Sequence, residues 1–159
     1  MRKTVIGVIG GGDAAPPSVI AEAEKLGRLI ASKGWILLNG GRNAGAMNGS
    51  AKGAHEAGGL TIGLLPEDSD RNASAFLDVR IVTSLGSARN NVLVLSSDLV
   101  IACPGAAGTL SEVALALKAH RTVVLMGFDL GMEFHEAAGG RLHVAKDAAD
   151  AVAIAESKI

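Results

Sequence analysis

Hydrophobic residues occur in short apolar runs, and these runs alternate with longer segments that mix small, polar and apolar residues. The runs are rich in Val, Ile and Leu, which is typical of strands buried on both faces of a parallel sheet. They predict strands over residues 4–9, 35–38, 60–65, 79–82, 97–103, 122–126 and 142–144.

The segments between these strands have the spacing of helices. Residues 20–32 place Ala23, Leu26 and Ile30 on one helix face, and Gly34 follows where such a helix would end. Small and helix-favouring residues extend the pattern along the chain. They predict further helices over 47–57, 88–95, 112–119 and 148–155.

Polar residues indicate the caps and the loops. Ser84 or Ser87 can cap the helix over 88–95, and Asp147 can cap the last helix. Residues 66–75 read as a surface loop, and 127–140 as an irregular stretch with one helical turn around Glu133. Because strands and helices alternate, we expect residues 1–159 to form one doubly wound, Rossmann-like α/β domain. Its mostly parallel sheet would have about six or seven strands, with helices on both faces.

Composition and charge narrow the class of partner. The chain has 159 residues, 48% of them hydrophobic, and a formal net charge of −1 without a polybasic block. This argues against nucleic-acid and membrane-surface partners. A single cysteine, Cys103, excludes an internal disulfide and is expected to pack at a strand end. No apolar run suits a signal peptide or a membrane span, so we expect a cytoplasmic protein.

Three of the expected strand-to-helix loops are rich in glycine, at 10–12, 40–45 and 105–108. In a parallel sheet all such loops open at the carboxyl edge, where ligands bind. Glycines let backbone N–H groups approach a ligand, and the first turn of a helix leaves further N–H donors unpaired. We therefore expect one site for a phosphate or another oxyanion. Its residues would be Gly10, Gly11, Gly12, Gly40, Gly41, Gly105, Ala106, Ala107, Gly108 and Thr109.

A purely structural interpretation of the third loop stays open. Thr109 and Glu112 have the spacing of a capping box, in which each side chain bonds the other's backbone N–H. The glycines would then serve only the turn.

Charged residues belong to the same predicted edge. Arg42 lies in the second glycine loop, Arg89 near a helix start, and Glu112 early in the next helix. A cation is unfavourable at a helix N-terminus, so Arg89 suggests an anionic neighbour, either a ligand phosphate or Glu112. Surface solvation, or for Arg89 a plain salt bridge with Glu112, remains the alternative.

Other sites have weaker support. Residues 10–15 loosely match the dinucleotide fingerprint, but Pro16 interrupts the helix start and Asn39 ends the second strand where an acidic residue is needed. We therefore expect no NAD. The histidines lack metal-ligand spacing, so no metal site is expected.

Two motifs resemble those of the LONELY GUY (LOG) family and its relatives. Residues 40–47 resemble G-G-x-x-x-G-x-M, and residues 104–112 resemble P-G-G-x-G-T-x-x-E, with Arg89 at the family's upstream arginine. Members are often labelled lysine decarboxylases, but no residue pattern here supports PLP. The resemblance implies a nucleoside 5′-monophosphate phosphoribohydrolase of the cytokinin-activating type, with Arg89 and Glu112 as catalytic residues. Ala106 replaces a motif glycine and Asn90 replaces the usual lysine, and both changes weaken the enzyme interpretation.

A closer resemblance, over roughly residues 4–155, is to the molybdenum cofactor carrier proteins. It is carried by 34–38, 52–59, 61–63, 86–91 and 111–118. It implies a carrier of molybdopterin, held by the amides of 105–109 and the 10–12 loop, with Ser87 and Arg89 adding donors. It also implies a homo-oligomer, a dimer or a tetramer, and molybdoenzymes as acceptors.

Overall fold

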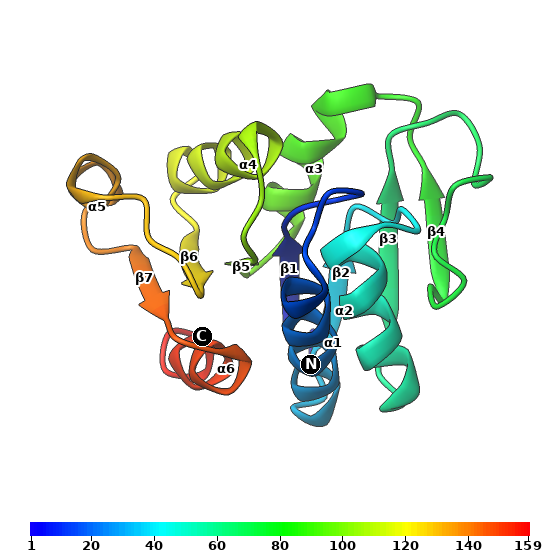
Figure 1. Cartoon of the computed structure of the whole chain (residues 1–159), viewed down its shortest axis with the longest axis horizontal. Helices are drawn as coiled ribbons and strands as arrows, with labels where there is room; N and C mark the ends of the chain where they lie inside the picture. Colours follow the sequence, from blue (N-terminus) through cyan, green and yellow to red (C-terminus); the bar gives the residue numbers. More distant parts are fainter.

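Seven parallel strands form one sheet in the computed structural model, which describes residues 1–159 (Figure 1). Their order is β4-β3-β2-β1-β5-β6-β7. The strands are β1 (Val5–Ile9), β2 (Ile36–Asn39), β3 (Thr61–Leu65), β4 (Val79–Val82), β5 (Leu99–Ala102), β6 (Thr122–Met126) and β7 (Leu142–Ala145). The predicted doubly wound α/β fold is confirmed.

The order of the strands reverses between β1 and β5. From β1 the chain builds outward to β4, then returns to pair β5 with the other side of β1, where Ile9 lies opposite Ala102. The loops after these two strands therefore leave the same edge side by side. Such a reversal is where ligands bind in open α/β sheets.

Helices cover both faces of the sheet (Figure 1). One face carries α1 (Pro17–Ser32), α2 (Gly45–Glu56) and α6 (Ala148–Glu156). The other carries α3 (Arg89–Ser96), α4 (Ala107–Lys118) and α5 (Met132–Ala138), with a short 3-10 turn, η1 (Gly86–Ala88), before α3. None of the helices is long and apolar enough to cross a membrane.

Helices α1 and α2 approach each other through glycines. A Cβ on Gly53 would collide with the carbonyl oxygen of Glu24, and one on Gly27 would collide with that of Ser50. The α1–α2 contact therefore depends on backbone packing against backbone. It fixes the two helices that follow the first and second glycine loops.

Helix starts differ most from the prediction. Helix α1 begins at Pro17 rather than at residue 20, because proline is favourable at the first helical position. Helix α4 begins at Ala107 rather than at residue 112. The predicted cap by Ser84 or Ser87 is wrong, since η1 leads into α3 and neither serine side chain caps it.

The C-terminal region follows the prediction more closely. Helix α5 is longer than the single expected turn around Glu133. The Asp147 carboxylate accepts a hydrogen bond from the Asp150 N–H at 2.9 Å, which confirms the predicted cap of α6. Gly34 has a φ of +70°, as expected for the residue that ends α1.

Candidate functional site

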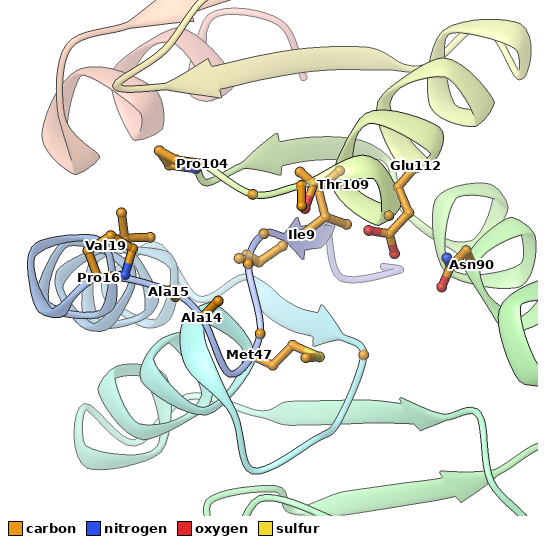
Figure 2. A pocket seen from close by; sticks show the side chains of 18 of the residues that line it. Ile9, Ala14, Ala15, Pro16, Val19, Met47, Asn90, Pro104, Thr109 and Glu112 are labelled. Atoms are coloured by element: carbon orange, nitrogen blue, oxygen red, sulfur yellow. The ribbon is translucent and has the colours of Figure 1, made fainter.

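A cavity of about 480 Å³ lies at the carboxyl ends of β1 and β5 (Figure 2). All three glycine loops reach it, and the first turns of α1 and α3 close its sides. We call it the glycine cavity. Its lining includes the expected residues Gly10, Gly11, Gly12, Gly40, Arg89, Gly105, Ala106, Gly108, Thr109 and Glu112.

The loops are bonded to one another as well as adjacent. The Gly11 N–H donates to the Pro104 carbonyl at 3.0 Å, and the Ala46 N–H donates to the Gly11 carbonyl at 2.9 Å. A Cβ on Gly105 would collide with the Thr109 side chain and lie 2.9 Å from the Gly11 nitrogen. Glycine at 105 is therefore required for the first and third loops to meet.

The start of α4 presents free backbone donors to the cavity. Ala106 precedes the helix with extended backbone, and no side chain caps it. The N–H groups of Ala107, Gly108 and Thr109 donate no hydrogen bond within the protein. The capping box is therefore not formed, because the helix starts early enough to place Thr109 inside its first turn. The free donors stand at the positive end of the helix dipole, an arrangement that suits an oxyanion.

Arg89, the first residue of α3, is buried and holds two strand ends together. Its Nη1 donates to the Gly40 carbonyl at 2.6 Å and to the Leu64 carbonyl at 2.5 Å. Its Nε is buried without a partner. Burial lowers the pKa of the guanidinium, which the charge of Glu112 partly opposes. Arginine nevertheless stays protonated, so the cavity keeps a fixed positive charge.

Glu112 and Asn90 occupy one end of the glycine cavity, opposite Val19 and Pro104 (Figure 2). Burial raises the pKa of the Glu112 carboxyl to about 7, and the charge of Arg89 acts against this rise. Glu112 accepts no hydrogen bond and forms no direct salt bridge with Arg89. The Oδ1 atom of Asn90 is also buried without a partner. This end therefore offers polar groups that the protein does not satisfy.

Several expected site residues lie outside the cavity lining. Arg42 is exposed and pairs with Glu67 at 3.1 Å, because the 66–75 loop folds back beside it. Gly41 is buried, with its N–H donated to Asn39 Oδ1 at 2.8 Å. Ser87 is exposed in η1. Ala107 is absent from the lining.

Sequence reasoning missed the apolar wall. Met47 of α2 is half-buried and lines the cavity, as does Val19 of α1. Because α1 starts at Pro17, Val19 lies in its first turn, at the cavity. Proline is common at the first position of a helix, so Pro17 could have predicted this start. Cys103 is fully buried, as expected, and burial raises the pKa of its thiol to about 12.

The histidines take no part in the site. His135 contacts Asp129 at 2.8 Å, and His55 lies 3.5 Å from Asp78. No three His, Cys, Asp or Glu side chains come together in a way that could hold a metal ion.

Comparisons with known proteins agree with this geometry. The SLOG cluster4 family model matches residues 3–154. An uncharacterized protein of Archaeoglobus fulgidus is 45% identical over 123 residues, 77% of this chain and 80% of that protein. The cytokinin riboside 5′-monophosphate phosphoribohydrolase of Mycobacterium tuberculosis is 36% identical over 97 residues. That match covers 57% of this chain and half of the enzyme.

Two solved structures are similar over nearly the whole chain. The molybdenum cofactor binding protein of Rippkaea orientalis superposes with a TM-score of 0.92 at 45% identity, covering 99% of this chain and 98% of its own. The Moco carrier protein of Chlamydomonas reinhardtii gives 0.91 at 46% identity, with 98% and 97% covered. Fold, loop motifs and family match agree: the chain belongs to the SLOG cluster4 family, within the LOG-like superfamily.

Proposed function

We propose that this protein binds and carries an anionic, phosphate-bearing cofactor, the molybdenum cofactor. The observation that carries the proposal is the first turn of α4, whose free N–H groups border the glycine cavity at the β1/β5 reversal. Backbone donors at a helix N-terminus bind phosphate and oxo groups well. The two similar structures described as Moco-binding and Moco-carrier proteins support the choice of ligand.

The chemistry of the cavity fits such a ligand. Glycine N–H groups and Thr109 would hold the phosphate, and the buried Arg89 would supply a compensating charge. Val19 and Met47 offer an apolar wall to a flat ring system. The molybdenum would arrive as part of the cofactor. When bound, it would supply the redox centre that an acceptor molybdoenzyme uses.

A second candidate is a nucleoside 5′-monophosphate phosphoribohydrolase, and Glu112 favours it. An ionised carboxylate beside a ribose can stabilise the positive charge that develops as the N-glycosidic bond breaks. In that case Arg89 would orient the ribose, and the start of α4 would hold the 5′-phosphate. The M. tuberculosis relative is described as such an enzyme. Against it, a pKa of about 7 leaves Glu112 only partly ionised at neutral pH.

The two candidates separate in one experiment. The protein is incubated with AMP and, separately, with the molybdenum cofactor released from a molybdoenzyme under anaerobic conditions. We expect near-stoichiometric cofactor binding, measured after gel filtration, and no release of adenine. Release of free base that disappears in the Glu112→Ala variant would overturn the carrier proposal in favour of the hydrolase.

The natural ligand can also be captured directly. Mass spectrometry of small molecules that co-purify with the native protein should detect a phosphorylated pterin or its oxidation product. The Gly105→Ala variant, purified in the same way, serves as the control because its first and third loops cannot meet. An equal yield from both proteins would contradict binding in the glycine cavity.

The homo-oligomer also remains our proposal. Large apolar side chains are more than one-third exposed on β4, before α3, on α3 and on α4: Val82, Leu85, Val92, Leu95 and Leu110. Association of copies would bury them. Light scattering after gel filtration should give the mass of a dimer or tetramer, reduced in Leu95→Lys. A monomer mass for the wild type would contradict this proposal.

A further inference from the structure

A smaller hollow of about 170 Å³ opens beside the glycine cavity. Val19 and Pro104 line both spaces, so the two are neighbours on the carboxyl edge of the sheet. In Figure 2 these two residues stand at the end of the glycine cavity away from Glu112. The hollow itself lies between the first turns of α1 and α6, and we call it the α6 lobe.

Two carboxylates line the α6 lobe, and each is held in place by a hydrogen bond. Glu22 Oε2 accepts from the Ala148 N–H at 3.0 Å, and Asp147 Oδ1 accepts from the Asp150 N–H at 2.9 Å. One oxygen of each carboxylate therefore accepts a hydrogen bond from the start of α6. The second oxygen of each accepts no hydrogen bond from the protein.

Two hydrogen-bond donors, Lys146 and Ser18, also line the lobe. The Lys146 ammonium pairs with no carboxylate, and Ser18 contributes an unpaired hydroxyl at the start of α1. The lobe thus combines two fixed acceptors with a cation and a hydroxyl. The negative charges of Glu22 and Asp147 would repel a phosphate placed in the lobe. A neutral group that donates two hydrogen bonds and accepts one matches the set better.

We propose that the α6 lobe binds the 2-amino-4-oxo-pyrimidine edge of a pterin, an edge that guanine shares. Its amino and ring N–H groups are adjacent donors for a carboxylate, and its carbonyl oxygen is an acceptor for Lys146. Adenine lacks that pair of adjacent donors. The inference rests on the proposed function, and it orients the ligand: phosphate at the start of α4, pterin towards α6, and Glu112 at the far end.

Stable ligand analogues test this orientation. Neopterin monophosphate, GMP, IMP and AMP are titrated into the full-length protein by calorimetry, with pterin fluorescence as a second readout. IMP differs from GMP only in lacking the 2-amino group. We expect neopterin monophosphate and GMP to bind at least about tenfold more tightly than IMP and AMP, as loss of a hydrogen bond to a charged group implies.

Two variants test whether the preference for GMP over IMP arises in the α6 lobe. Glu22→Gln and Asp147→Asn keep an acceptor oxygen for the start of α6 but remove the charge. Each should reduce the preference for GMP over IMP to below about threefold. Glu136→Gln, on exposed α5, is the matched control and should change nothing. If either lobe variant unfolds, the wild-type GMP to IMP ratio still decides the matter.

The outcomes separate the two levels of the proposal. Equal binding of GMP and IMP, or a preference that survives both lobe variants, overturns the inference while cofactor binding itself can stand. Failure to bind the molybdenum cofactor and all four probes overturns the proposed function as well. Tighter binding of GMP than of the pterin supports recognition of the shared edge and assigns it to guanine.

Discussion

Two groups of glycines in this fold meet very different neighbours. Gly27, Gly49 and Gly53 are buried between α1 and α2, where an added Cβ would strike backbone atoms of the facing helix. Gly12 and Gly108 line the glycine cavity, where an added Cβ would meet nothing closer than 3.9 Å. The first group lets protein approach protein, and we propose that the second leaves room for a ligand.

Gly105 combines the two cases, because it lines the cavity and is also packed closely against protein atoms. A Cβ there would strike the Thr109 side chain. The comparison therefore gives a graded set of alanine substitutions. They should lower stability between the helices, lower ligand affinity at Gly105, and disturb the fold least at the open positions.

The largest effect is expected for Gly53→Ala. Alanine ordinarily stabilises a helix interior relative to glycine by about 1 kcal/mol. Here the methyl group would collide with the Glu24 carbonyl oxygen, so α1 and α2 must separate. We expect the free energy of unfolding, measured in urea, to fall by about 3 kcal/mol. A loss below about 1 kcal/mol would contradict the tight backbone packing described for α1 and α2.

Gly105→Ala should act on the ligand more than on the fold. The added methyl would push the third loop from Thr109 and from the Gly11 nitrogen, 2.9 Å away. The bond from Gly11 N–H to the Pro104 carbonyl would then be strained. We expect cofactor affinity to fall on the order of a hundredfold, because small displacements of positioned donors are costly.

The control for that substitution is Gly12→Ala. A Cβ at Gly12 would come no closer than 3.9 Å to Met47 Cε, so the loop should keep its shape. Calorimetric titration should therefore find a much smaller loss of affinity in Gly12→Ala than in Gly105→Ala. Equal losses in both variants would mean that the contact between the loops is unimportant for the site.

The sequence predicted the sheet and its binding edge, because both depend on local patterns. Apolar runs located all seven strands, and a parallel sheet necessarily gathers its strand-to-helix loops at one edge. The predicted start of α4, at residue 112, lies five residues after the observed start at Ala107. Glycine has a low helix propensity, so the motif does not predict a helix at Gly108. That Gly108 is helical became visible only in the folded structure.

The hydrogen-bond partners of Arg89 could not be predicted from the local sequence around it. Its position at a helix start suggested an anionic neighbour, yet its Nη1 donates to two carbonyls, of Gly40 and Leu64. Both carbonyls come from strand ends remote in sequence. The ion pair of Arg42 could not be predicted for a similar reason, since its partner Glu67 lies in a loop whose path the sequence does not reveal.

Glu112 should make ligand binding depend on pH. Its pKa is raised from 4.5 to about 7, so between these values the folded protein holds more protons than the unfolded chain. Stability should therefore fall as pH rises through that window. Above pH 7 the ionised carboxylate should also repel an anionic ligand. We expect affinity at pH 8 to be about tenfold weaker than at pH 6.

The Glu112→Gln variant isolates this contribution. A ligand phosphate also titrates near pH 6, which changes its own charge across the same range. Glutamine removes only the protein's titration, so the difference between wild type and variant reports Glu112. Identical pH profiles for the two proteins would mean that the carboxylate does not face the ligand.

The smallest effect is expected for Gly108→Ala, and its sign completes the comparison with Gly53. Both glycines are helical, but a Cβ at Gly108 has no neighbour within 4 Å. The intrinsic helix preference of alanine should therefore act unopposed and raise the free energy of unfolding by about 0.5–1 kcal/mol. Urea unfolding of the two variants side by side measures the contrast. If Gly108→Ala destabilised the protein as Gly53→Ala does, the start of α4 would be packed against protein and could not offer its N–H groups to a ligand.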